Sequence, residues 1–250
     1  MTPEKVIEAL DIPQGARVYQ RIAKKLLTEN AAVTTADKRQ INDCVEELVW
    51  IAALKPHTIG VSEYRDGSRE VLEIAVLHLS LREGAKVTRI VELIHRAIPY
   101  PTLLVTSIDN TISLSLAAMR WSQNEGGKTV LDEEPLLVDI ANDTRQEAFL
   151  AALSLRGQHR VHLHELYLFW KTQFAAYQAS FFTGSFNPTL TAVVAEKRNT
   201  ALMAATRIQQ ELLALKSQAG RESQVNRRVQ LNLDIKRLEQ ELTGVIEDMR

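Results

Sequence analysis

The stretch from Arg69 to Arg120 constrains the fold more than any other part of this 250-residue chain. Its first segment, Glu70 to Leu81, is apolar at odd and even positions alike, which predicts a strand inside a sheet that is covered on both faces. The next segment places apolar residues at the spacing of one buried helical face, and Pro99 ends it. These apolar residues are Val87, Ile90, Val91, Ile94 and Ile98.

Two more strands complete this unit. The runs Pro101 to Ile108 and Thr111 to Leu116 flank Asp109-Asn110, a two-residue connection that suits the positive backbone dihedral angles of a tight β-hairpin turn. Strand, helix, strand, turn and strand in this order predict an α+β domain, in which a mixed sheet is flanked by helices.

Basic residues are concentrated in a segment before this unit. The run Val18 to Leu27 has a helical pattern, and Arg17, Arg21, Lys24 and Lys25 recur at steps that place them along one surface. Such a surface suits contact with nucleic-acid phosphates, but it also suits a solvated helix face above a buried apolar side. Both interpretations stay open.

A further amphipathic helix is predicted to begin at Thr34-Thr35. Its apolar stripe includes Cys44, and a single cysteine excludes an internal disulfide and fits a reducing cytoplasm. We expect Cys44 to be a small buried side chain and not a nucleophile. The whole stripe consists of Ile41, Cys44, Val45, Leu48, Val49 and Ala52.

Aromatic residues follow the helical spacing from Leu163 to Phe181, with Trp170 near the centre of the stripe. Such a stripe is typical of a core or a protein interface. Glycine, serine and an asparagine-proline pair then occur together between Phe182 and Pro188. We therefore predict a mixed α/β domain over residues 1–185 and a helical assembly region over residues 186–250.

Two long helices are predicted in this second region, with an interruption at Gly220. The last helix repeats apolar residues at alternating steps of four and three, which is the heptad pattern of a coiled coil. The two helices either fold back on each other or pair with a second chain, and assembly is the expected purpose in both cases. The heptad residues are Leu231, Ile235, Leu238, Leu242, Val245 and Met249.

Composition and missing motifs exclude several classes of protein. The formal net charge of -1 argues against a surface coated for nucleic acid, although local basic patches stay compatible with it. No signal-peptide pattern and no run of eighteen apolar residues occurs, so we expect a soluble cytoplasmic protein without membrane contact. Phosphate loops, dinucleotide fingerprints, GxSxG and HExxH are absent, so we expect no cofactor and no enzyme of those classes.

Two groups of residues contain side chains that commonly bind metal ions. His159, His162 and His164 are clustered, but their spacing does not converge on one face of a helix, so we expect no metal there. Glu70, Glu73 and Asp109 lie near the predicted sheet, as the carboxylates of metal-dependent nucleases do, but no glutamate-x-lysine element follows. Glu73 has apolar neighbours, and we expect it to pair with a basic residue.

Three segments resemble a bacterial family of unknown function of about this length. They are AIPYPTLLV (Ala97 to Val105), SLSLAAMRWSQ (Ser113 to Gln123) and RVQLNLDIKRLEQEL (Arg228 to Leu242). Genes of that family are found beside DNA methyltransferases and helicases in restriction-like and phage-defence loci. The resemblance implies an accessory role in such a system and assigns no active residues.

These observations lead to one main hypothesis and two alternatives. The main hypothesis is a non-catalytic subunit that binds a helicase or methyltransferase and forms a homo-oligomer through its C-terminal helices, with Trp50, Trp121 and Trp170 as further interface candidates. The first alternative is a divergent metal-dependent nuclease that uses Glu70, Glu73 and Asp109. The second is DNA contact through the basic residues Arg17, Arg21, Lys24 and Lys25.

Overall fold

The computed structural model describes residues 1–31, 34–122, 129–156, 161–189 and 191–250. The chain divides into two compact units, Met1–Lys171 and Thr172–Arg250. Helix α7 (Leu163–Thr183) contributes its first half to unit 1 and its second half to unit 2. The fold is α+β, as predicted, with a mixed sheet in unit 1 and long helices towards the C-terminus.

Unit 1 is built on a six-stranded sheet with the order β1-β2-β5-β6-β7-β10 among the described residues. Neighbouring strands are antiparallel except for β5 and β6, which are parallel and joined by helix α5. The elements are β1 (Arg17–Arg21), β2 (Val45–Leu54), β5 (Ile74–Leu81), α5 (Val87–Ala97), β6 (Thr102–Ile108), β7 (Thr111–Ala117) and β10 (Leu136–Asp139).

The segment from β5 to β7 confirms the prediction for its sequence. Leu77 and Leu79 of β5 point into an apolar cluster with α5, whereas Val76 is buried on the opposite face of the sheet. The β6–β7 turn has two residues between the paired Ile108 and Thr111, and Asp109 takes a positive φ of 50° there. The predicted strand Glu70 to Leu81 is divided in the structure, because only Ile74–Leu81 form the parallel, doubly covered β5, whereas Glu70–Val71 belong to a separate hairpin.

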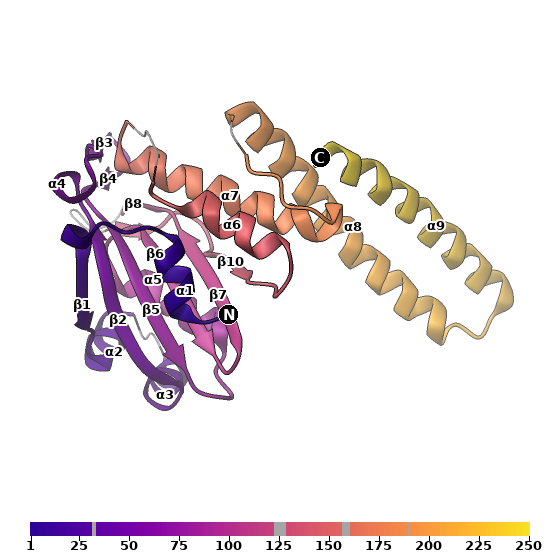
Figure 1. Ribbon diagram of the computed structural model, residues 1–250. Helices are drawn as coiled ribbons and strands as arrows, with labels where there is room; N and C mark the ends of the chain where they lie inside the picture. The colour runs from indigo at the N-terminus through magenta and orange to yellow at the C-terminus, as the bar shows by residue number, and fades with distance from the viewer. Residues whose placement is uncertain (32–33, 123–128, 157–160, 190) are drawn as a thin grey trace. The chain divides into compact units, whose positions relative to one another are not determined.

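Helices cover both faces of the sheet (Figure 1). One face carries α5 together with α2 (Lys24–Asn30) and α3 (Thr35–Cys44), which share an apolar cluster with β2, β5 and β6. The other face carries α1 (Pro3–Ala9), α6 (Arg145–Leu153) and the first half of α7. There the Tyr167 hydroxyl lies 2.9 Å from the Thr102 carbonyl oxygen and 3.0 Å from that of Ala117, so its single proton is shared between these two acceptors. It also accepts from the Ala117 amide at 2.8 Å, and these contacts anchor α7 to β6 and β7.

Small elements surround the ends of the sheet. Two hairpins are formed by β3 (Tyr64–Arg65) with β4 (Glu70–Val71) and by β8 (Met119–Trp121) with β9 (Thr129–Leu131), and the short helices are η1 (Gln14–Ala16) and α4 (Pro56–Ile59).

The predicted helix over Val18 to Leu27 is wrong. The structure has the edge strand β1 followed by α2, so the basic residues do not form a ridge on one helix. Pairing with β2 supplies the backbone hydrogen bonds of Arg17 and Arg21, and the pairing is irregular between them, where Tyr19 has a φ of 51°. Tertiary pairing at the sheet edge thus overrides a local pattern that also fits a helix.

The second predicted helix is correct only in its first half. Thr34 caps α3 by accepting from the Asp37 amide, and Asp37 accepts from the Thr34 amide in return. The helix ends at Cys44, and the rest of the predicted stripe forms β2, a strand that pairs on both sides with β1 and β5. Short apolar runs do not distinguish a buried strand from a helix, which explains the error.

Unit 2 consists of the second half of α7, α8 (Ala192–Arg221) and α9 (Val225–Asp248). Helices α8 and α9 lie antiparallel and side by side, joined by the turn 222–224 (Figure 1). The structure therefore shows the helical hairpin, one of the two arrangements that the sequence left open, within a single chain. It does not establish a coiled coil.

Candidate interaction surfaces

The heptad residues of α9 face α8 of the same chain. Ile235 and Leu238 are buried with Ile208 and Leu212 of α8, and Leu242 and Val245 pack beside them. Leu231 is half-buried on the same side of α9. The predicted seam is real, but its core residues are already covered by α8 and are not available to a second chain without opening the hairpin.

The hairpin is fastened at its base, where α8 begins and α9 ends. The buried Arg198 guanidinium donates to the carbonyl oxygens of Met249 (3.1 Å) and Asn187 (2.8 Å) and to the Thr189 hydroxyl. Gln173 exchanges two hydrogen bonds with the Thr189 backbone. Burial lowers the pKa of Arg198, and these acceptors compensate its charge. The base is therefore a polar clamp, whereas farther along the hairpin an apolar seam joins the two helices, with exposed ion pairs beside it.

The outer side of α9, opposite α8, carries an apolar ridge formed by Val225, Val229 and Leu233. Their exposed fractions are 63%, 53% and 57%, although all three are large apolar residues. Their spacing of four places them on one face, half a turn away from Ile235 and Leu238. Because apolar side chains are usually covered, this valine ridge is a candidate protein-binding surface.

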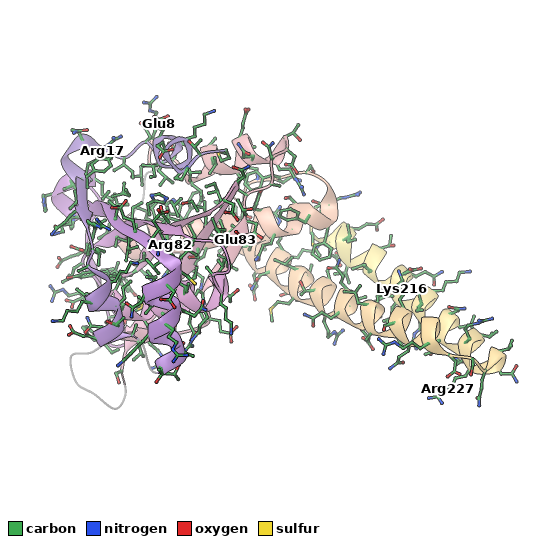
Figure 2. The ribbon with its side chains drawn as sticks, turned by 90° about the horizontal axis from the view of Figure 1, so that it is seen from below. Glu8, Arg17, Arg82, Glu83, Lys216 and Arg227 are labelled. Atoms are coloured by element: carbon green, nitrogen blue, oxygen red, sulfur yellow. The ribbon has the colours of Figure 1, made fainter. Side chains whose placement is uncertain are left out.

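A groove of about 480 Å³ lies at the base of the hairpin, between the start of α8 and the end of α9. Apolar and acidic side chains line it, and Lys197 pairs with Asp248 at 3.1 Å within it. Val193 at its rim is 78% exposed. The base groove is lined by Val193, Glu196, Lys197, Thr200, Ala201, Ala204, Val245 and Asp248. Figure 2 shows Arg227 at the opposite end of the hairpin.

The three tryptophans lie in different environments. Trp170 is fully buried and donates its indole N–H to the Leu153 carbonyl at 3.0 Å, so it belongs to the core of unit 1 and not to a surface that a partner can reach. Trp50 packs edge-on against Tyr100 with ring centroids 6.1 Å apart. Trp121 and Tyr100 line a hollow of about 320 Å³, so Trp50 and Trp121 remain near the surface.

The four predicted basic residues lie along the sheet edge and the start of α2. Arg21 and Lys25 pair with Glu47 (3.4 Å) and Glu29, while Lys24 donates to the Asn42 carbonyl. Arg17 donates to the Ile12 carbonyl and to the Tyr19 hydroxyl.

Tyr19 is the residue that sequence reasoning missed at this edge. It is 56% exposed and lies between Arg17 and Arg21 in a left-handed conformation that bulky residues rarely adopt. Its position between two arginines was the available signal, because aromatic rings among basic residues are typical of surfaces that bind single-stranded nucleic acid.

The structure separates the candidate nuclease carboxylates. Glu73 precedes β5 and Asp109 follows β6 at the other end of these parallel strands, so roughly 20 Å of strand lies between them. The buried Glu73 carboxylate pairs with Lys55 at 3.0 Å, the basic partner that its sequence context predicted, and Glu70 pairs with Arg65 at 2.8 Å. A metal ion bound by all three carboxylates is incompatible with this arrangement.

The histidine cluster has a structural explanation for two of its members. The ring of Tyr64 packs against His162 and His164 with centroids 4.4 and 4.8 Å away. His162 Nδ1 also accepts from the Glu165 amide and so caps the start of α7. His159 lies outside the described residues. Within those residues, no three histidine, cysteine, aspartate or glutamate side chains gather as a metal site would require.

Two histidine–serine pairs lie on opposite faces of the sheet. His95 Nε2 is 2.9 Å from Ser115 Oγ in the interior, and burial lowers the pKa of His95 to about 3. His78 Nε2 is 3.0 Å from Ser107 Oγ at the half-exposed carboxyl ends of β5 and β6, and burial lowers the pKa of His78. Within the described residues no carboxylate hydrogen-bonds either histidine, so neither pair has the third member of a hydrolase triad.

The described helices are each too short or too polar to span a bilayer. Comparison with curated proteins and with solved structures found no match. A family model does match residues 10–242, which is nearly the whole chain and includes the sheet, α7, α8 and most of α9. The chain therefore belongs to the family described as Domain of unknown function (DUF4391).

Proposed function

We propose that this chain is a non-catalytic accessory subunit of a bacterial restriction-like, anti-phage defence complex. In this proposal its C-terminal hairpin is the assembly surface, which binds a helicase or methyltransferase subunit and a second copy of the chain. The defence context comes from the family resemblance in the sequence, and the assembly role comes from the hairpin.

One observation carries the assembly role. The heptad seam closes within the chain, yet the valine ridge on the far side of α9 stays more than half exposed. Met203 and Leu213 of α8 are also exposed, at 68% and 65%. Because α8 and α9 already bury one apolar seam between them, these exposed apolar residues do not contribute to the folding of the hairpin. Large exposed apolar patches mark protein interfaces.

Co-expression with the neighbouring helicase and methyltransferase tests this proposal. We expect an affinity-tagged chain to retain at least one of the two proteins, and the ridge variant Val225→Ser, Val229→Ser, Leu233→Ser to lose it. The matched control replaces three exposed apolar residues of unit 1, Val18→Ser, Leu26→Ser and Leu168→Ser. Retention by the ridge variant, or equal loss in the control, would contradict docking through the hairpin.

A second candidate function is contact with single-stranded DNA through the β1 edge. The observation that favours it is the exposed ring of Tyr19 between Arg17 and Arg21. Binding of a fluorescent single-stranded oligonucleotide should then weaken steeply with salt and weaken further in Tyr19→Ala.

A further inference from the structure

Charge is distributed unevenly along the hairpin. Residues 216–237, which form its tip, carry six basic and two acidic side chains. Residues 192–211 and 238–250, which form its base, together carry four basic and six acidic side chains. The tip is therefore positive and the base negative, although the whole chain has a formal net charge of only -1.

Ion pairs inside the hairpin neutralise part of the charge at each end. Lys216 pairs with Glu239, Arg227 with Glu222, Arg207 with Glu241 and Lys197 with Asp248. In the part of the chain that the structure describes, the other charged side chains of the hairpin have no ion-pair partner. At the tip these are Arg221, Arg228, Asp234, Lys236 and Arg237, and at the base they are Glu196, Arg198, Glu211, Glu247 and Arg250, of which Arg198 is buried.

The unpaired charges accompany the two apolar features of the hairpin. Arg228, Lys236 and Arg237 lie within one helical turn of the valine ridge, because residues three or four apart are neighbours on a helix. Glu196 lines the base groove together with Val193 and Ala204. The ridge is apolar with basic neighbours and the groove is apolar with an unpaired acidic residue, so the two features are complementary in charge.

We propose that the hairpin binds a second copy of itself in antiparallel orientation, with the valine ridge of each copy in the base groove of the other. This inference rests on the proposed assembly function and names one partner and its geometry. A two-fold axis makes the contact twice, and each positive tip then lies on a negative base. A parallel pair would place the positive tips together.

Charge-reversal variants of the full chain test this geometry. The tip variant is Arg228→Glu, Lys236→Glu, Arg237→Glu, and the base variant is Glu196→Lys, Glu211→Lys, Glu247→Lys. All six residues are exposed and have no ion-pair partner among the described residues, so the hairpin itself should keep its helical circular dichroism signal. The control Lys38→Glu, Arg39→Glu, Lys86→Glu makes the same charge change as the tip variant in exposed residues of unit 1.

Light scattering and sedimentation of these variants distinguish the outcomes. We expect the wild type and the control to form dimers, and each hairpin variant alone to dimerise roughly 10- to 100-fold more weakly. A one-to-one mixture of the tip and base variants should form a heterodimer, because both contacts are then attractive again. Raised salt should weaken the wild-type dimer.

Three results would overturn the inference. They are a wild type that stays monomeric at all concentrations, a tip variant that keeps the wild-type affinity, and a mixture that does not restore the dimer. A monomeric wild type that still binds the helicase or methyltransferase would refute self-association and leave partner docking intact. A dimer that is insensitive to the charge variants would refute only the antiparallel geometry.

Discussion

Unit 1 and the helical hairpin differ in how completely their central elements are covered. In unit 1 the central strand β5 is covered on both faces, and the buried Glu73 beside it is paired with Lys55. In the hairpin each helix covers one side of the other, and large apolar residues stay exposed on the remaining sides. This difference supports the proposal that the hairpin is the assembly surface.

The seam of the hairpin gives the largest expected effect. Replacing Leu238 and Leu242 with lysine removes two apolar groups from the α8–α9 contact and should cost about 4 kcal/mol or more, enough to unfold α9. Circular dichroism should show the loss of helix, and limited proteolysis should cut within residues 222–250. If the helix persisted and only the solution mass fell, the seam would join two chains and not two helices of one chain.

Truncating one leucine in each unit compares how much a buried and an exposed side chain contribute to stability. Leu77→Ala in β5 should lower the free energy of unfolding by about 2–5 kcal/mol, because Leu77 is fully buried. Leu233→Ala on the valine ridge should change it by less than about 0.5 kcal/mol, because Leu233 is 57% exposed. Urea unfolding of the two variants checks this. Equal destabilisation would show that the ridge is part of the fold and not a free surface.

Acidification should act on the interior of unit 1. Burial lowers the pKa of His95 from 6.5 to about 3, so the unfolded chain takes up the proton more readily than the folded one. The stability of unit 1 is then intact above pH 6.5 and falls as the pH drops towards 3, by about 1 kcal/mol per pH unit from this group. Urea unfolding at several pH values should show this slope.

Two histidine variants separate His95 from other titrating groups. His95→Gln should flatten the dependence of stability on pH, whereas His57→Gln, which alters an exposed histidine in α4, should leave it unchanged. An unaltered slope in His95→Gln would show that other groups control the acid response of unit 1.

The smallest effect is expected at the edge strand. Tyr19→Gly relieves a left-handed backbone conformation that costs bulky residues about 1–2 kcal/mol, but it also adds flexibility to the unfolded chain. The two contributions nearly cancel, and we expect the free energy of unfolding to change by less than about 1 kcal/mol. A larger loss of unfolding free energy, measured by urea unfolding, would show that packing of the Tyr19 ring stabilises the fold.

The elements that could be predicted are those whose periodicity or turn residues are visible within a short stretch of sequence. The buried strand Ile74–Leu81, the following helix and the Asp109-Asn110 turn were found because each has its own periodicity or turn chemistry, but the break between β4 and β5 was missed. Strands β1 and β2 were missed because their residues also fit helical spacing. Their strand form depends on pairing across the sheet, which the sequence does not display.

The interaction surfaces were predictable in part. The heptad of α9 was found, but not that α8 covers it, because the sequence does not say which partner closes a seam. The four-residue spacing of Val225, Val229 and Leu233 could have predicted the valine ridge. It was overlooked because the same helix also carries the heptad residues. The pairs Glu73–Lys55 and His78–Ser107 join residues distant in sequence, and only the folded sheet brings them together.

Hydrogen-exchange mass spectrometry of the full chain tests the central claim most directly. The chain is compared alone at low concentration, alone at high concentration, and mixed with the helicase or methyltransferase that we propose as its partner. We predict slower exchange on association in peptides from residues 192–204 and 225–237, with the sheet strands unchanged. Slower exchange confined to the strands of unit 1, with the hairpin peptides unaffected, would contradict the assignment of the hairpin as the assembly surface.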